Sequence, residues 1–387
     1  MWDRFSPAEM ERRFSLARGL MEERELDALV VFGNSGVNRA NQANVFWLSN
    51  QLDLHHCYLV LPREGDAALL VGLANHVPNA REVSDVPVIE WGGYRPADTM
   101  AERLRGVRRA GLVGVNAKFR VGMPYEHYLA LRERVPELVD VTAAFQRLRL
   151  VKSEEEIEWL RRAAELTDLG MRALAEGARP GMTEAELVAL AEGAYRPQGG
   201  APRITFLRSM PMDEPTGCVP AQNPSGRRIE RGDVIITELS ASYWGYTGQV
   251  HRPVFVGAEP APEWQKLFDA AKEAYDGMAA ALRPGATEPD LVHAAEPIRA
   301  AGYTICDDLV HGYGVDILPP LIDRARFERP ADESGAVFER GMAVVVQPNP
   351  ITADERMGLQ LGALTLVTDG GAESLHRVPL EPLLVEV

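Results

Sequence analysis

The sequence predicts a mixed α+β protein in two parts, an N-terminal α/β domain over residues 1–150 and a duplicated α+β domain over residues 151–387. Three observations lead to this prediction. Strand-like and helical patterns alternate in the first part, a ten-residue segment occurs twice in the second, and a long hairpin pattern lies between the two copies. A chain of 387 residues is long enough for two domains of ordinary size.

The first part opens with a well-marked helix. Ser6 is a suitable cap, Pro7 takes the first helical position, and Glu9 completes a capping box. Strand-like runs follow at residues 28–32, 57–61, 67–71, 86–89 and 111–115, with helical patterns at residues 99–105 and 125–134. This alternation is typical of an α/β layer domain, and no glycine-rich phosphate loop indicates a nucleotide site.

A repeat organises the second part. Residues 179–188 return as residues 283–292 with seven identities in ten positions, and each copy contains Arg-Pro-Gly followed by a Thr-Glu helix start. We therefore expect two related halves, about 151–255 and 256–387, that close around a shared sheet.

The hairpin pattern spans residues 232–255 and turns at Trp244-Gly245. Counting outward from the turn brings Ser240 opposite Gln249 and Glu238 opposite His251. Because side chains alternate along a strand, these four residues share one face. A carboxylate opposite an imidazole can fix its tautomer and raise its basicity, although such a pair also occurs as a plain polar contact on a sheet surface.

Composition excludes several classes of protein. The formal net charge is −15 and no run is rich in Lys or Arg, which argues against binding to nucleic acid. No run of eighteen apolar residues predicts a membrane span. The three cysteines stand far apart and outside any CxxC spacing, so we expect a cytoplasmic protein without structural zinc.

Several landmarks follow the hairpin in a recognisable order. They are residues 311–316, a strand at 341–348 and a closing strand at 364–370. With them the chain resembles, over nearly its whole length, the pita-bread fold family of methionine aminopeptidase, prolidase, aminopeptidase P and creatinase. The resemblance implies a creatinase/prolidase-like N-terminal domain, a pita-bread C-terminal domain, and a homodimer in which the N-terminal domain of one chain closes the pocket of the other.

The peptidases of this family hold two metal ions with five side chains. By resemblance these positions fall on Glu238, Gln249, His311, Gln347 and, on or beside it, Gly362. Only one carboxylate and one imidazole remain, which leaves little charge to offset the dehydration of divalent ions. We therefore expect no metal and no other cofactor.

These observations together predict a metal-independent, creatinase-like hydrolase that cleaves an amide, amidine or ureido C–N bond of a small polar metabolite. The expected catalytic residues are Glu238, His251 and His311, with His251 as a base that titrates near neutrality and His311 either as the acid or as the group that polarises a carbonyl. The expected substrate-binding residues are Gln249, Gln347, Ser240, Tyr313, Arg329, His55 and His56.

Two alternatives stay open at this point. One is a lyase or cyclising enzyme that uses the same pocket, and the other is a non-catalytic binding protein. Whether Cys218 is reactive is also open. The four other histidines have no partner visible in the sequence and are expected to be structural or solvent-facing: His76, His127, His293 and His376.

Overall fold

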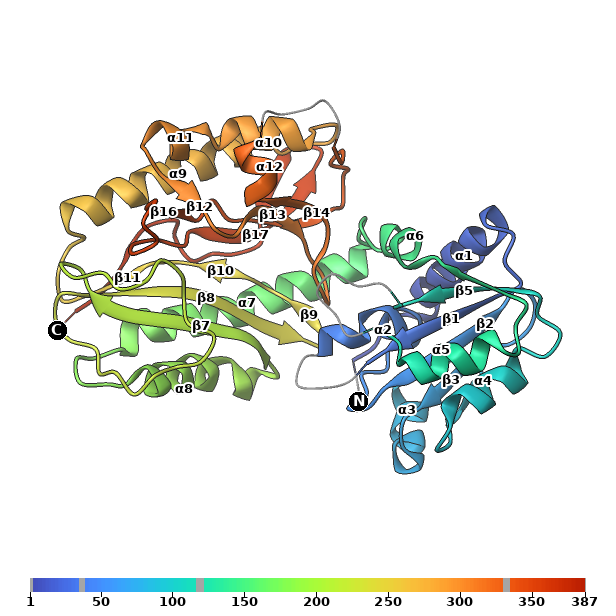
Figure 1. The fold of residues 1–387 in the computed structure, drawn as a ribbon. Helices are drawn as coiled ribbons and strands as arrows, with labels where there is room; N and C mark the ends of the chain where they lie inside the picture. Colours follow the sequence, from blue (N-terminus) through green and yellow to red (C-terminus); the bar gives the residue numbers. More distant parts are fainter. Residues whose placement is uncertain (1–2, 35–38, 116–121, 330–334, 387) are drawn as a thin grey trace. The chain divides into compact units, whose positions relative to one another are not determined.

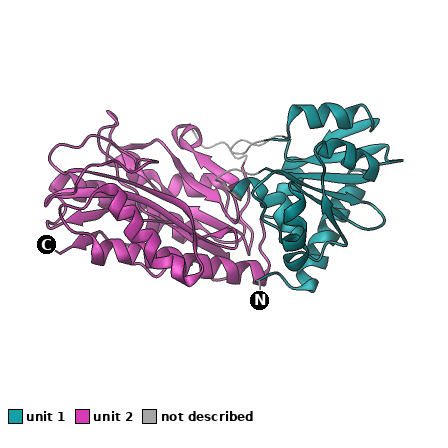
Figure 2. Cartoon of the chain, turned by 90° about the horizontal axis from the view of Figure 1, so that it is seen from below, with its two compact units in different colours: residues 1–149 teal, residues 150–387 magenta. Residues whose placement is uncertain are grey.

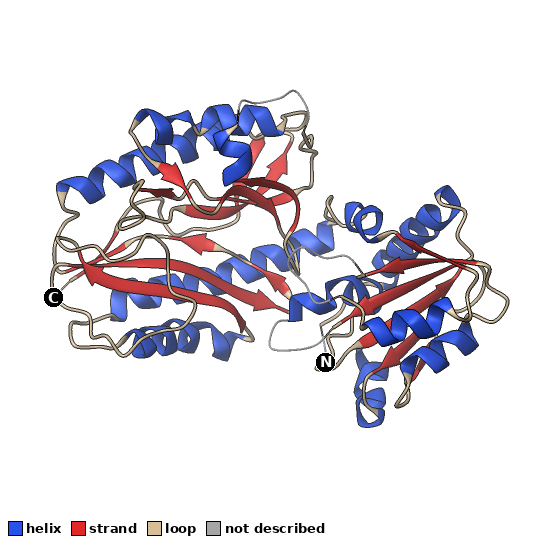
Figure 3. Ribbon diagram, in the orientation of Figure 1, coloured by secondary structure: helices blue, strands red, loops and turns tan. Residues whose placement is uncertain are grey.

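The computed structural model describes residues 3–34, 39–115, 122–329 and 335–386. The chain divides into two compact units, residues 1–149 and residues 150–387 (Figure 2). Helices and strands are mixed in both units (Figure 3), which confirms the predicted α+β fold class.

Unit 1 is built on a six-stranded mixed sheet in the order β4-β3-β2-β1-β5-β6. Its strands are β1 (Ala28–Gly33), β2 (Cys57–Pro62), β3 (Ala68–Val71), β4 (Val88–Trp91), β5 (Arg109–Val113) and β6 (Glu137–Asp140). Its helices are α1 (Pro7–Glu23), α2 (Ala43–Ser49), α3 (Val77–Val83), α4 (Pro96–Arg103), α5 (Tyr125–Arg132) and α6 (Thr142–Arg147).

Strand β1 explains how this unit is layered. Its side chains alternate between the two faces, so Leu29 packs in one core cluster with residues of α1 and α2, and Val30 packs in another with residues of α4 and α5. Ser6 caps α1 as predicted, because its hydroxyl accepts a hydrogen bond from the Glu9 N–H at 3.1 Å.

Unit 2 is built on an 11-stranded sheet whose main path runs β14-β13-β15-β17-β10-β8-β11-β19 (Figure 1). Its strands are β7 (Ala201–Pro211), β8 (Asp233–Tyr243), β9 (Tyr246–Thr247), β10 (Val250–His251), β11 (Val254–Val256), β13 (Asp308–Gly312), β14 (Leu318–Asp323), β15 (Ala343–Val346), β17 (Gly362–Thr368), β18 (Gly371–Ser374) and β19 (Leu383–Val385). A two-stranded sheet pairs β12 (Thr304–Ile305) with β16 (Pro350–Ile351).

The helices of unit 2 are α7 (Glu154–Gly177), α8 (Glu184–Tyr195), α9 (Pro262–Ala281), α10 (Glu288–Ala294), α11 (Glu296–Ala300) and α12 (Arg324–Glu328). Figure 1 shows α7 and α8 against the part of the sheet that contains β7 and β8, and α9 to α11 against the part that contains β13 and β17. Among the described residues, no helix is both long and apolar enough to cross a membrane.

The two copies of the repeat adopt the same local structure. Gly181 and Gly285 both have left-handed φ angles, of 92° and 88°. Their N–H groups donate to the carbonyls of Ile229 and Phe338, in the segments that lead into β8 and β15. Capping boxes follow at the starts of α8 and α10. The repeat therefore places a helix start and a strand start side by side in each half of the sheet.

The hairpin has the register counted from the sequence. Tyr243 pairs with Tyr246 beside the turn, and Leu239 pairs with Val250 further along. Leu239 and Val250 belong to the core cluster that contains residues of α7 and α8. Because side chains alternate, Glu238, Gln249 and His251 face the opposite way, toward the side of the sheet away from these helices.

Candidate active site

Five polar residues lie on the face of the unit 2 sheet that points away from its helices, and we call them the polar cluster: Glu238, Gln249, His251, His311 and Gln347. They come from β8, from β10 and the residue before it, from β13 and from the end of β15, and β17 lies between the β13–β15 pair and the β10–β8 pair. The repeat positions these elements, since β8 and β15 begin at its two equivalent sites.

Gln249 lies between the other two hairpin residues of the polar cluster. Its Nε2 atom donates to Oε1 of Glu238 at 2.9 Å and lies 3.0 Å from Nε2 of His251. Because an amide nitrogen only donates, Nε2 of His251 accepts and the imidazole proton lies on Nδ1. Glu238 thus acts on His251 through an amide, whereas the sequence predicted a direct contact.

Two contacts fix the position of the His311 ring, a hydrogen bond and an aromatic contact. Its Nδ1 atom is 3.2 Å from the carbonyl oxygen of Gly312, so the N–H donates there and Nε2 keeps its lone pair. The ring meets that of Tyr313 edge-on, with 5.1 Å between centroids. His311 and Tyr313 are both buried.

Two acidic residues that sequence reasoning missed adjoin the polar cluster. Nε2 of Gln347 donates to Oδ1 of Asp308 at 2.9 Å and is 3.5 Å from Oδ2 of Asp307. Burial raises the pKa of Asp307, and burial together with the Asp307 charge raises the pKa of Asp308. The only sequence signal for them is their position three and four residues before His311.

The pKa shifts in the polar cluster run against the predicted chemistry. Burial lowers the pKa of His251 to about 3 and that of His311 to about 4. Burial, followed by the charge of Asp307, raises the pKa of Glu238 to about 8. At pH 7 both imidazoles are therefore neutral and Glu238 mostly keeps its proton. The prediction that His251 titrates near neutrality beside a charged Glu238 is wrong, because burial outweighs the neighbouring groups.

Many buried atoms of this site lack a well-formed hydrogen bond. Within the described ranges, the buried atoms without a hydrogen bond of good geometry include Oε1 of Gln249, Nδ1 of His251, Oε1 of Gln347, Oγ of Ser240 and the hydroxyl of Tyr313, although the Asn349 side chain adjoins His251 and the two hydroxyls adjoin each other. Leaving a buried polar atom unpaired costs roughly 1–3 kcal/mol, so such atoms are rare unless a ligand or water satisfies them. Their concentration on one face indicates a binding site for a polar molecule.

Arg203 is a further residue that the sequence did not reveal. Burial raises the pKa of the Tyr313 hydroxyl, and the charge of Arg203 together with hydrogen bonding to Ser240 and Arg203 acts to lower it. Nε of Arg203 is buried without a partner. Ser240 and Tyr313, both predicted substrate contacts, therefore lie together and beside Arg203.

The remaining predicted substrate contacts are Arg329 in unit 2 and His55 and His56 in unit 1. Arg329 is exposed at the end of α12, and the described residues show no contact between it and the polar cluster. His55 and His56 precede β2 in unit 1 and pack on different histidines, with centroids 5.9 Å from His76 and 5.5 Å from His127. Their role as substrate contacts stays a prediction.

Three histidines without a visible partner in the sequence have one in the structure, and one of them is His127, whose Nδ1 atom is 2.6 Å from the Tyr58 hydroxyl. Nδ1 of His76 is 2.7 Å from Asp53, and Nδ1 of His376 is 2.7 Å from Asp168. The His376–Asp168 pair is buried and joins the segment after β18 to α7. All three pairs fit the predicted structural role of these histidines.

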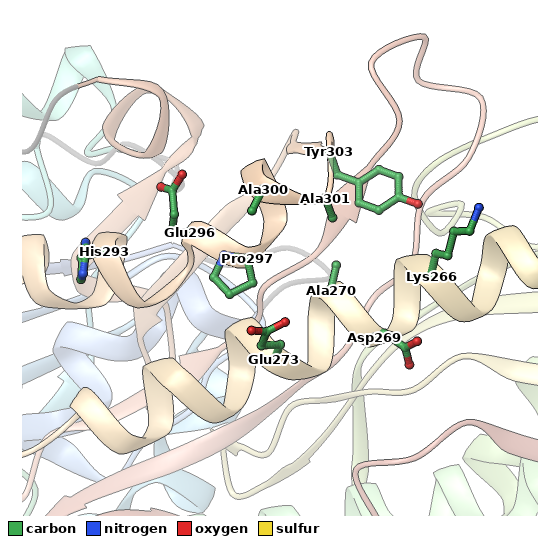
Figure 4. Close-up of a pocket in the computed structure, with 10 residues that line it drawn as sticks. All are labelled: Lys266, Asp269, Ala270, Glu273, His293, Glu296, Pro297, Ala300, Ala301 and Tyr303. Carbon is green, nitrogen blue, oxygen red and sulfur yellow. The ribbon is translucent and has the colours of Figure 1, made fainter.

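A surface groove of about 750 Å³ lies between α9, α10 and α11 (Figure 4). Its charged and polar lining residues are Lys266, Asp269, Glu273, His293, Glu296 and Tyr303. None of the predicted site residues lines it, so we place the candidate active site at the polar cluster.

The polar cluster does not fit a two-metal centre. Within the described ranges, no three His, Cys, Asp or Glu side chains are arranged to hold a metal ion. Gln249 and Gln347 offer neutral amides in place of carboxylates. Position 362 has no room for a side chain, because a Cβ added to Gly362 would lie 2.7 Å from the Val346 carbonyl oxygen and 2.9 Å from Cβ of Gln347. We therefore assign no step of the chemistry to a bound metal.

Comparison with known proteins identifies the family. Residues 158–369 match the model of metallopeptidase family M24, and residues 13–151 match the creatinase/prolidase N-terminal domain. The Xaa-Pro dipeptidase of Pyrococcus furiosus is 25% identical over 379 residues, which cover 97% of this chain and 100% of the relative.

Solved structures have the same fold. The prolidase from Pyrococcus horikoshii OT3 matches with a TM-score of 0.80 at 23% identity, covering 95% of this chain and 99% of the other. Dipeptidase PepE from Mycobacterium ulcerans matches with a TM-score of 0.80 at 23% identity over the full length of both chains. The recognised pita-bread family and its two-domain fold class are thus confirmed.

The comparisons overturn the predicted function. The matched model is that of a metallopeptidase family and the full-length relatives are named Xaa-Pro dipeptidases, so the prediction of a metal-independent, creatinase-like hydrolase of a small polar metabolite is wrong. The prediction depended on five ligand positions, whereas the likeness extends over the whole chain. The chain belongs to metallopeptidase family M24, a family of enzymes that hydrolyse the C–N bond of a peptide.

Proposed function

We propose that this enzyme hydrolyses the amide bond of a short peptide of the Xaa-Pro type. The observation that carries the proposal is the set of buried polar atoms without a well-formed hydrogen bond on the face of the unit 2 sheet that carries the polar cluster, which we call the inner face. This set includes both donors and acceptors. A dipeptide presents both kinds of group within a few ångströms. The full-length likeness to a relative named Xaa-Pro dipeptidase supports the same substrate class.

The protonation states suggest how the polar cluster acts. Glu238, protonated at neutral pH, is our candidate for the proton donor to the leaving nitrogen. His311, with Nε2 free to accept, is our candidate for the group that takes a proton from the attacking water. Oε1 of Gln249 and Oε1 of Gln347 are candidates to accept hydrogen bonds from the substrate.

The test is release of free proline from Leu-Pro, Met-Pro and Ala-Pro, with Leu-Gly as the comparison substrate. Each assay is run after chelation and again with added Mn²⁺, Co²⁺ or Zn²⁺. We expect proline release that Glu238→Ala abolishes and that Glu259→Gln, a change at an exposed residue, leaves intact. A folded protein that releases no proline under any of these conditions contradicts the proposal.

The homodimer implied by the sequence resemblance stays a prediction. Light scattering of the purified protein measures it directly, and a mass near 42.6 kDa, that of one chain, refutes it.

A further inference from the structure

Arg203 is brought to the inner face by an irregularity in the sheet. Along β7 and β8, Pro202 pairs with Ala241 and Ile204 pairs with Ser240, so Arg203 is an extra residue without a partner in the register. This is a β-bulge, a device that redirects a side chain and often lies beside an active site. The bulge turns Arg203 toward the face that carries Ser240.

Three hydrogen-bond donors meet at this point. Nε of Arg203, Oγ of Ser240 and the hydroxyl of Tyr313 are all buried, and none has a partner of good geometry. Ser240 and Tyr313 are each only 1% exposed. Ser240 and Arg203 both act on the Tyr313 hydroxyl as hydrogen-bond partners, so the three groups adjoin one another, and among the described residues no carboxylate or carbonyl accepts from Nε of Arg203.

The charge of Arg203 is also uncompensated. Within the described ranges, no carboxylate lies within ion-pair distance of its guanidinium. A half-buried guanidinium without a counter-ion favours an anion, and its planar fork matches a carboxylate.

We propose that Arg203, Ser240 and Tyr313 form a carboxylate-binding subsite that holds the C-terminal carboxylate of the substrate. The assignment of this carboxylate to a peptide rests on the function proposed above, whereas the subsite itself does not. The guanidinium pairs with the carboxylate, and the two hydroxyls donate to its oxygens.

The subsite is tested by comparing an acid with its amide. Kinetics are measured for Leu-Pro and for Leu-Pro amide, which lacks the negative charge, with the wild-type enzyme and with Arg203→Met. We expect Arg203→Met to raise KM for Leu-Pro by about 10- to 100-fold, as for loss of a hydrogen bond to a charged group. For the amide we expect a change of less than about threefold.

Arg208→Met is the matched control. Arg208 is on the same strand and also half-buried, but its guanidinium lies against Gly217, with Nη1 2.5 Å from where a Cβ of Gly217 would be. This variant should affect the acid and the amide alike. An equal loss for both substrates in Arg203→Met, or the same acid-specific loss in Arg208→Met, overturns the proposal.

Two further variants and one further measurement keep the test decisive. If Arg203→Met does not fold, Ser240→Ala and Tyr313→Phe each remove a single oxygen and should each weaken Leu-Pro several-fold more than the amide. If no peptide is cleaved, calorimetry with N-acetylproline and N-acetylprolinamide tests the subsite alone. Binding of the acid only, lost in Arg203→Met, supports the subsite while the proposed function fails; equal binding of acid and amide overturns the subsite.

Discussion

Replacing Glu238 by glutamine should make the protein more stable, and the gain should grow with pH. Burial and the Asp307 charge raise the pKa of Glu238 from its usual 4.5 to about 8. Between these values the folded state keeps a proton that the unfolded state releases, so the wild type loses stability as the pH rises through this window. The glutamine of the Glu238→Gln variant carries no titratable proton, and its amide oxygen can still accept the hydrogen bond from Nε2 of Gln249.

The magnitude follows from the pKa difference. At 1.36 kcal/mol per pKa unit, ionisation of Glu238 costs about 1.4 kcal/mol at pH 5.5 and roughly 4.6 kcal/mol at pH 8.5. The difference in unfolding free energy between Glu238→Gln and the wild type should therefore increase by about 3 kcal/mol between these two pH values. The assay is urea unfolding of metal-free protein at both pH values, followed by circular dichroism and tryptophan fluorescence.

An exposed residue provides the control for this experiment. Glu259→Gln removes a carboxylate from the surface and should give the same small difference from the wild type at both pH values. A Glu238→Gln difference that does not change with pH would show that Glu238 is ionised in the folded protein at pH 7. The proposed role of Glu238 as a proton donor would then be lost as well.

Three further predictions concern packing and assembly. Arg252→Met should destabilise the protein by at least about 3 kcal/mol in urea unfolding, because the buried guanidinium donates to four carbonyls, including those of His251 and Gly362. Gly362→Ala should cost about 1–3 kcal/mol in the same assay, since the new methyl group would press on the Val346 carbonyl, and an unchanged midpoint would contradict this packing. Light scattering should give twice the mass of one chain, independent of Gly362→Ala.

The local features of the hairpin were predictable from the sequence. A two-residue turn at Trp244-Gly245 fixes the register of both arms, and the period of two then assigns each side chain to a face. The observed pairs Tyr243–Tyr246 and Leu239–Val250 follow from this counting. The repeat was likewise readable because its Gly and Thr residues have local conformational roles, a left-handed turn and a helix cap.

The features that failed depend on contacts between distant segments. His376 meets Asp168 across 208 residues, and nothing in either local sequence marks the other. The bulge at Arg203 is a property of the pairing between β7 and β8, so a pattern of single strands does not show it. The pKa of His251 is set by its burial, which the sequence expresses only through the packing of the whole sheet.

The charges on the inner face explain why one arginine can matter so much there. At pH 7 His251 and His311 are neutral, Glu238 is mostly protonated, and Gln249 carries no charge. Asp307 and Asp308 contact Gln347, whereas among the described residues no carboxylate lies at ion-pair distance from Arg203, which stands beside the Ser240 and Tyr313 hydroxyls. In such surroundings an ion pair is stronger than in water, and the energy lost by leaving these donors unpaired is recovered when a carboxylate binds. A substrate that carries a carboxylate at this end gains both contributions, whereas its amide gains neither in full, and this is why the comparison of acid with amide is the sensitive test of the site.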